Sequence, residues 1–227
     1  MLGSHTSTAA DACSLPARWS TLPGPHHVKI AGLLEHAHAG SVPTPLLDRA
    51  RATLRHWRTA AEAGALTGEL HPLLYFLEGL VIDAVARETV PPWALIRGVL
   101  GQVMSASTPQ GDLPEQLSHA GGTRRSDIAA QALRLCVLAS TGSAAQDGGG
   151  SGTALRERAA RLCGALTSRY IGPGGAVHSF PLHGPGAPNG PNPPNVWAAI
   201  FTYQALRYHA YLLGGERVPM SMVSTLA

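Results

Sequence analysis

Glu78 is the residue of this sequence whose type and setting most clearly suggest chemistry. It shares one face of a predicted helix with Leu74 and Val81, so apolar side chains surround its carboxylate. A buried carboxylate must be paired, face a ligand or be protonated, because an isolated charge is unfavourable away from water. Glu78 is therefore predicted either to act as a general acid or base or to form an ion pair with a neighbouring helix.

His71 begins the same helical segment, two turns before Glu78. An imidazole at a helix N-terminus can bind an anion or shuttle a proton near neutral pH. The alternative is that His71 only helps Pro72 to start the helix. His71 and Glu78 are the two candidate catalytic residues.

A polar stripe marks a second helical segment, which is otherwise rich in alanine. Asp127, Gln131 and Arg134 follow one another at helical spacing, so they share one face. Gln131 and Arg134 can donate hydrogen bonds to a hydroxyl-rich ligand, while Asp127 is also well placed to stabilise the start of its helix. The stripe predicts either a binding surface or a polar network between helices.

The last predicted helix carries aromatic side chains with polar tips. Trp197 and Tyr203 can stack on sugar rings, although such residues also pack cores. Asn195 stands just before this helix, where its side chain can cap the helix or bind a ligand.

Metal and cofactor motifs are missing from the sequence. His178 and His183 flank a short segment of a long loop, but no third residue has the spacing of a metal ligand. Neither a phosphate-binding loop nor a strand-linked dinucleotide motif occurs. We expect no metal and no cofactor.

Hydrophobic periodicity predicts an all-α chain. Proline at the first turn and glycine after the last turn mark several helix ends. The one strand-like fragment, residues 176–180, is too short to found a sheet. The seven predicted helices span residues 25–39, 44–63, 71–87, 91–105, 126–140, 153–170 and 195–213.

The predicted helices are of two kinds. The second and sixth have one apolar face, whereas the third, fifth and seventh are apolar all round and are expected to be buried. Long loops lead into the fifth and seventh helices. Residues 141–152 and 184–194 are rich in small and turn-forming residues, so both are predicted to be irregular or mobile.

The alternation of inner and outer helices resembles the α/α-toroid proteins, and in particular the six-hairpin carbohydrate-active superfamily. The resemblance extends over residues 25–213 and is carried by HPLLYFLEGL from His71, RSDIAAQALRL from Arg125 and NVWAAIFTYQAL from Asn195. It implies a ligand cleft where the inner helices begin, and thus predicts that His71, Glu78, Asp127 and Asn195 surround one cavity. Six hairpins of roughly 60 residues would need ~360 residues, so the chain corresponds to a partial toroid.

The resemblance implies a carbohydrate-active epimerase, glycosidase or lyase that binds a saccharide or another small polar ligand. Glu78 and His71 are then the acid–base candidates, and the substrate-binding candidates are Asp127, Gln131, Asn195, Trp197 and Tyr203. Two alternatives remain: a non-catalytic helical scaffold for a protein or glycan partner, and a small-molecule biosynthetic enzyme that uses the same cavity. A second copy or a partner protein is expected to complete the helical ring.

The composition of the chain bears on which partners it binds and in which compartment it works. Sixteen of the 17 basic residues are arginines and lie scattered along the chain, with a net charge of +3 and 5% aromatic residues, which disfavours a nucleic-acid partner. No apolar run is long enough to span a membrane. Three widely spaced cysteines and a polar N-terminus predict a cytoplasmic protein. Residues 1–23 are expected to form an arm, 24–213 the helical domain and 214–227 a tail.

Overall fold

The structure is a computed structural model that describes residues 22–37, 41–66, 68–118, 122–142 and 150–223. Within these ranges the chain is all-helical and contains no strand, which confirms the predicted fold class. The predicted arm at residues 1–23 lies almost wholly outside the described residues, as does most of the segment 141–152 that was expected to be mobile.

All seven predicted helices are present, and their ends lie within three residues of the expected positions. One short helix, α8, falls in the predicted C-terminal tail. The helices are α1 (His27–His36), α2 (Thr44–Glu62), α3 (Leu70–Ala86), α4 (Trp93–Ser105), α5 (Ser126–Gly142), α6 (Gly150–Arg169), α7 (Val196–Leu213) and α8 (Met220–Val223).

The chain divides into two compact units. Among the described residues, unit 1 comprises residues 22–66, 71–95 and 219–223, with α1, α2, nearly all of α3, the start of α4, and α8. Unit 2 comprises residues 68–70 and 96–218, with the rest of α4 and with α5, α6 and α7. The predicted domain 24–213 is therefore shared between the two units.

Helix starts follow the local signals of the sequence. Pro45 lies in the first turn of α2, where its missing N–H removes no helical hydrogen bond. Asn195 is the N-cap of α7, and its side-chain oxygen accepts a hydrogen bond from the Ala198 N–H at 3.1 Å.

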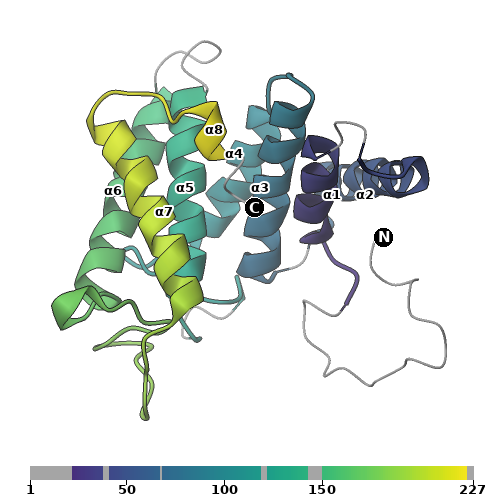
Figure 1. Cartoon of the computed structure of the whole chain (residues 1–227). Helices are drawn as coiled ribbons and strands as arrows, with labels where there is room; N and C mark the ends of the chain where they lie inside the picture. The colour runs from purple at the N-terminus through teal and green to yellow at the C-terminus, as the bar shows by residue number, and fades with distance from the viewer. Residues whose placement is uncertain (1–21, 38–40, 67, 119–121, 143–149, 224–227) are drawn as a thin grey trace, which may run out of the picture. The chain divides into compact units, whose positions relative to one another are not determined.

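Unit 2 is built around α5. Every residue from Ser126 to Ser140 is buried, and α5 packs against both α6 and α7. The three helices lie side by side in Figure 1, where α5 and α7 begin at the same end and α6 runs in the opposite direction. On α6 the apolar residues Leu155, Ala159 and Leu162 are buried, as expected for an amphipathic outer helix.

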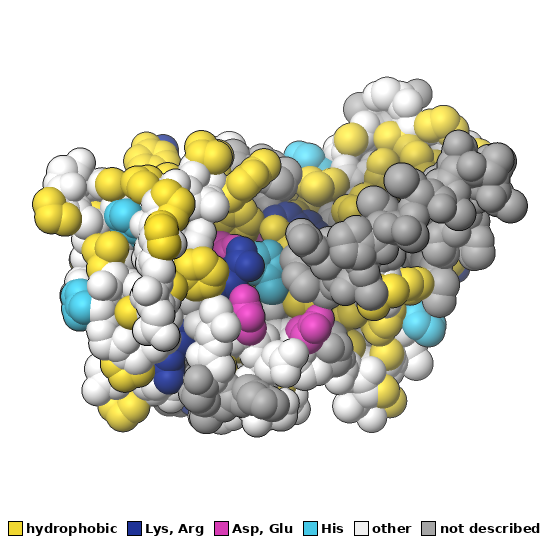
Figure 2. Space-filling model, turned by 90° about the horizontal axis from the view of Figure 1, so that it is seen from below, with side chains coloured by type: hydrophobic (Ala, Val, Ile, Leu, Met, Phe, Trp, Pro, Cys, Tyr) yellow, Lys and Arg dark blue, Asp and Glu magenta, His cyan; other side chains and the backbone are white. Residues whose placement is uncertain are grey.

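Helix α7 departs from the expectation that it is buried all round. Val196, Trp197, Ile200 and Tyr203 are exposed along one side, while Ala198, Thr202 and Ala205 are buried on the other. Hydrophobic side chains also reach the surface widely on the face drawn in Figure 2. An apolar composition alone therefore did not reveal that α7 has an open side.

The loop between α6 and α7 is irregular, as predicted for residues 184–194. Its only regular pairing among the described residues is through isolated bridges, from Ile171 to Val177 and from His178 to Pro194. None of the described helices combines the length and the hydropathy needed to cross a membrane.

Candidate functional site

Glycines bring the backbones of α1 and α3 into direct contact in unit 1. A Cβ on Gly79 would lie 2.5 Å from the Lys29 backbone nitrogen and 2.5 Å from the carbonyl carbon of Val28, where no side chain fits. A Cβ on Gly32 would likewise lie 2.7 Å from the carbonyl oxygen of Gly79. Because of this close approach, the backbone of Lys29 on α1 lies beside Gly79, the residue that follows Glu78 on α3.

Lys29 and Glu78 form a buried ion pair between the two helices. The Lys29 Nζ donates a hydrogen bond to the Glu78 Oε2 at 2.9 Å. Glu78 is completely buried and Lys29 is 8% exposed. The pairing explains how a carboxylate can lie within the apolar α3, because buried charges need a partner.

His71 and Tyr75 extend this group toward the surface. The Lys29 Nζ lies 4.4 Å from the centre of the Tyr75 ring, and the His71 ring meets Tyr75 edge-on with ring centres 4.6 Å apart. Both rings are only half-buried. His71, Tyr75 and Glu78 follow one another at helical spacing, so one face of α3 carries an imidazole, a phenol and a carboxylate in that order.

Two further histidines lie at the start of α1, one as its N-cap and one as its first residue. His26 and His27 are buried, with ring centres 4.3 Å apart. Burial, together with smaller contributions from the neighbouring His27 and His71, lowers the pKa of His26 from 6.5 to about 4. Burial also lowers the pKa of His27. Both imidazoles are therefore neutral at pH 7.

The other buried carboxylate described in unit 1 is fully engaged by arginines. Arg51 donates to Glu35 through two nitrogens at 2.7 and 3.3 Å, and Arg87 lies 3.3 Å from the same carboxylate. Arg87 also binds Asp83 at 2.7 Å. These acids hold α1, α2 and α3 together and offer no open carboxylate beside Glu78.

In unit 2 the loop before α7 fastens the starts of α5 and α7 at one end. Ser126 donates its backbone N–H to the carbonyl oxygen of Ser179 at 2.9 Å and its hydroxyl to that of His178 at 2.8 Å. Asn195 donates its N–H to the carbonyl oxygen of Val177 at 2.9 Å. The helices α5 and α7 therefore begin side by side and run in the same direction, so the polar residues predicted on each lie on neighbouring helices.

Asp127 is tied to its own helix start. Arg125 donates to both of its carboxylate oxygens, at 3.0 and 2.5 Å, and the Ile128 N–H donates to one of them at 3.0 Å. A carboxylate in the first turn also interacts favourably with the helix dipole. The geometry thus gives Asp127 a structural role.

Gln131 and Arg134 lie inside unit 2. Both are at most 1% exposed. Arg134 donates a hydrogen bond to the side-chain oxygen of Gln204, and its guanidinium carbon lies 4.8 Å from the centre of the Phe201 ring. This contact joins the polar stripe of α5 to α7 and corresponds to the interhelical network that the sequence left as one alternative.

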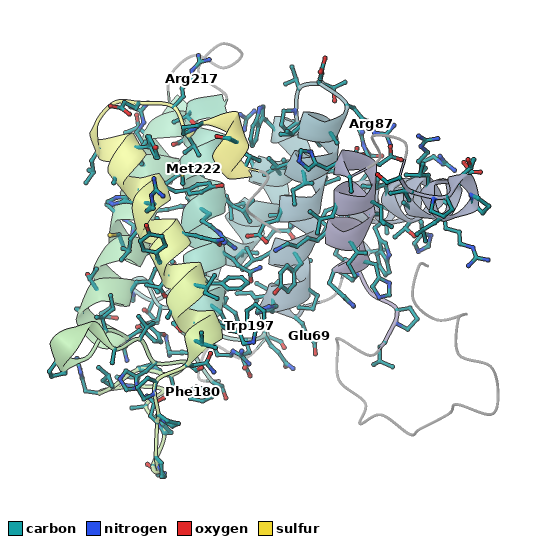
Figure 3. The ribbon with its side chains drawn as sticks, viewed as in Figure 1. Glu69, Arg87, Phe180, Trp197, Arg217 and Met222 are labelled. Carbon is teal, nitrogen blue, oxygen red and sulfur yellow. The ribbon has the colours of Figure 1, made fainter. Side chains whose placement is uncertain are left out.

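Trp197 and Tyr203 form the open side of α7. Their side chains are 67% and 63% exposed. Trp197 lies at the first turn of α7, at the same end of unit 2 as Phe180 of the preceding loop (Figure 3). Trp197, Phe201 and Gln204 lie on one side of α7. The exposed Trp197 is therefore on the same side of the helix as the two residues that contact Arg134.

The predicted site residues fall into two groups. His71 and Glu78 belong to unit 1, whereas Asp127, Gln131, Asn195, Trp197 and Tyr203 belong to unit 2. Within unit 1 the structure brings His71 and Glu78 into one cluster through Tyr75 and Lys29. A cavity shared by the residues of both groups stays a prediction.

Sequence reasoning overlooked Lys29 and Tyr75, although both left a signal. Lys29 is the only lysine among 17 basic residues, and its ammonium group differs from a guanidinium in size and in hydrogen-bonding geometry. Tyr75 lies one turn after His71 and one turn before Glu78, on the same helix face.

Within the described residues, no three His, Cys, Asp or Glu side chains gather as a metal site requires. Comparison of the chain with family models, with curated proteins and with solved structures finds no match.

Proposed function

We propose that the protein is a carbohydrate-active enzyme that transfers a proton on a bound saccharide, with His71 and Tyr75 as its catalytic residues. The observation that carries this proposal is the cluster at the start of α3. There a half-buried imidazole and a half-buried phenol touch each other next to the buried Lys29–Glu78 pair. Imidazole and phenol groups are both competent general acids and bases.

Lys29 and Glu78 act as positioning residues in this proposal. The ammonium group of Lys29 is held 4.4 Å from the Tyr75 ring centre by its bond to Glu78. A fixed positive charge at that distance stabilises negative charge that develops on the phenol as its proton leaves. Glu78 keeps Lys29 in place and does not itself touch the substrate.

Because Glu78 and Glu35 are both held in ion pairs, proton transfer is a better candidate reaction than glycoside hydrolysis. Most glycosidases need two carboxyl groups on either side of the scissile bond. In the described part of unit 1, Glu78 is bound by Lys29 and Glu35 by Arg51 and Arg87. An epimerase or a lyase needs only groups that remove and return a proton, which His71 and Tyr75 supply.

The open side of α7 is a separate surface, on unit 2, whose side chains suit a saccharide. Exposed Trp197 and Tyr203 offer flat apolar faces with polar edges, which suit the CH faces and the hydroxyl groups of a sugar ring. Together with Val196 and Ile200 they make a continuous exposed apolar patch, and such patches mark binding surfaces.

A screen for saccharide turnover tests the proposal. Neutral and acidic oligosaccharides are incubated with the protein, and the products are separated by chromatography. We expect His71→Ala and Tyr75→Phe to lower kcat by about 10²-fold or more, with unchanged far-UV circular dichroism. His56→Ala, which removes an exposed histidine of α2, is the control and should keep full activity. Turnover that survives in both His71→Ala and Tyr75→Phe would refute the assignment.

A non-catalytic scaffold is the second candidate, and the exposed apolar side of α7 favours it. Val196, Trp197, Ile200 and Tyr203 would then bind a protein partner or a second copy that completes a helical ring. Sedimentation analysis of the wild type and of Trp197→Ala separates the two functions. If the protein is a scaffold, the wild type should sediment as an assembly and Trp197→Ala as a smaller species. Neither protein should turn over any saccharide.

A further inference from the structure

Unit 2 contains a cavity of about 400 Å³ in which charged side chains are almost completely buried. It lies between the loop that follows α4, the end of α6 and the loop after α6. Its volume is within the range of small-molecule sites in proteins. The residues that line it are Thr108, Gln110, Asp112, Arg124, Ser168, Arg169, His183, Gly184 and Pro185.

Asp112 is the centre of the charged lining. It is completely buried, and Arg169 and Arg124 both form ion pairs with its Oδ2, the latter at 4.0 Å. The Tyr170 hydroxyl donates to the Asp112 Oδ1 at 3.1 Å. Burial raises the pKa of Tyr170 to about 12, so the phenol stays protonated and remains a donor.

The backbone fixes these groups in place. Gly111 has φ of +92°, and a Cβ on it would lie 2.5 Å from the carbonyl oxygen of Arg161 on α6. The neighbouring Asp112 N–H donates to the Thr108 hydroxyl at 3.1 Å. From α6, Arg169 reaches across and donates to the carbonyl oxygens of His183 and Pro185, at 3.0 and 2.7 Å. The loop after α4, the end of α6 and the loop after α6 therefore build the cavity together.

We propose that this cavity binds an oxyanion, namely the carboxylate or phosphoryl group of a small ligand. Its lining carries two guanidinium groups, at most 9% exposed, against the single carboxylate of Asp112. Planar guanidinium groups match the geometry of carboxylate and phosphate oxygens. Their attraction for an anion is stronger at a buried position than on an open surface.

Neutral donors complete the lining. Gln110 lies at the exposed edge of the cavity and offers an amide N–H. The Thr108 hydroxyl accepts from Asp112 and can donate its own proton into the cavity. The site contains none of the residues on which the proposed catalytic function rests, so each proposal can fail without the other.

Calorimetric titration tests the proposal. Inorganic phosphate and citrate are the probes for the two oxyanion classes, and sodium chloride keeps the ionic strength constant. We expect one of them to bind saturably, with a Kd below ~1 mM. Arg124→Gln should weaken that binding about tenfold or more, and the preferred probe identifies the class. The control Arg156→Gln removes the same charge from the exposed face of α6 and should leave Kd unchanged.

Gln110→Ala and Thr108→Val give a second reading if Arg124→Gln does not fold. Each removes one neutral hydrogen-bond donor from the cavity and should raise the Kd of the bound probe about threefold or more. Failure of both probes to bind saturably would overturn the proposal. Equal losses in the cavity variants and in Arg156→Gln would also overturn it, because they would indicate a general charge effect.

Discussion

At the scale of single residues, the account depends on Lys29. This residue is buried against Glu78 and lies over the ring of Tyr75, so it connects the ion pair to the proposed catalytic group. A lysine places one compact charge where the wider guanidinium group of an arginine would need more space and more acceptors. The single lysine of the chain is thus explained by its surroundings.

Lys29→Met should destabilise the protein by about 3–5 kcal/mol, because it leaves the buried Glu78 carboxylate without its ammonium partner. The double variant Lys29→Met, Glu78→Met removes both charges and should recover much of that loss. Urea unfolding of the wild type, the two single variants and the double variant gives the coupling energy. Additive losses would show that the two side chains do not interact in solution.

The buried histidines predict how stability depends on pH. The pKa of His26 is about 4 in the folded protein and 6.5 when the group is unperturbed, so the folded state binds fewer protons between these values. The free energy of unfolding should therefore fall as the pH falls from about 6.5 to about 4, by up to ~3 kcal/mol. His27, whose pKa is also lowered, adds to the same slope.

Urea denaturation of wild type and His26→Gln at several pH values checks this dependence. The variant lacks the titrating imidazole, so its stability should change less over the same pH window. Parallel curves for the two proteins would exclude His26 as the source of the slope.

At the scale of elements, glycine determines how α1 and α3 pack. Gly79→Ala would place a Cβ 2.5 Å from the backbone of α1, so the two helices must move apart and the Lys29–Glu78 bond must lengthen. We expect a loss of about 3 kcal/mol or more in unfolding free energy. Gly98→Ala in α4 is the matched control, since its Cβ would meet nothing within 4 Å.

The control should stabilise the protein by about 0.5–1 kcal/mol, as alanine favours the helix over glycine. Thermal unfolding of both variants gives the comparison. If Gly79→Ala were as well tolerated as Gly98→Ala, the close contact of α1 with α3 would be wrong.

The cap of α7 gives a second prediction for an element. Asn195→Ala removes the acceptor of the Ala198 N–H and should destabilise the protein by about 1 kcal/mol, whereas Asn195→Asp should be nearly neutral. Asn189→Ala, in the exposed part of the same loop, should change little. The melting temperatures of the three variants provide the measurement. Equal melting temperatures for Asn195→Ala and Asn189→Ala would contradict the cap.

Local signals explain why the helices, and His71 and Glu78 within one of them, could be predicted, whereas the partners of Glu78 could not. Pro45 and Asn195 act on neighbouring residues, so the starts of α2 and α7 are readable from the sequence. The partner of Glu78 lies 49 residues away, and its position depends on how closely two glycines allow helices to approach. Asp112 gave no signal at all, because its partners Arg124 and Arg169 meet only through the tertiary fold.

At the scale of the whole molecule, the two units carry separate parts of the account. Unit 1 holds the Lys29–Glu78 pair with His71 and Tyr75, while unit 2 holds the exposed aromatic side of α7 and the cavity around Asp112. The proposed relation to toroid proteins rests on the helical hairpins and on the segments that begin at His71, Arg125 and Asn195.

Solvent-isotope labelling tests the central claim, that His71 and Tyr75 move a proton on a bound saccharide. The saccharide identified by the turnover screen is incubated in D₂O with wild type and with Tyr75→Phe, and the products are followed by NMR. We predict deuterium at one ring carbon of an epimerised sugar, or a new carbon–carbon double bond. Either product should form about 10²-fold more slowly with Tyr75→Phe. A hydrolysed saccharide with neither change, or equal rates for the two proteins, would contradict the claim.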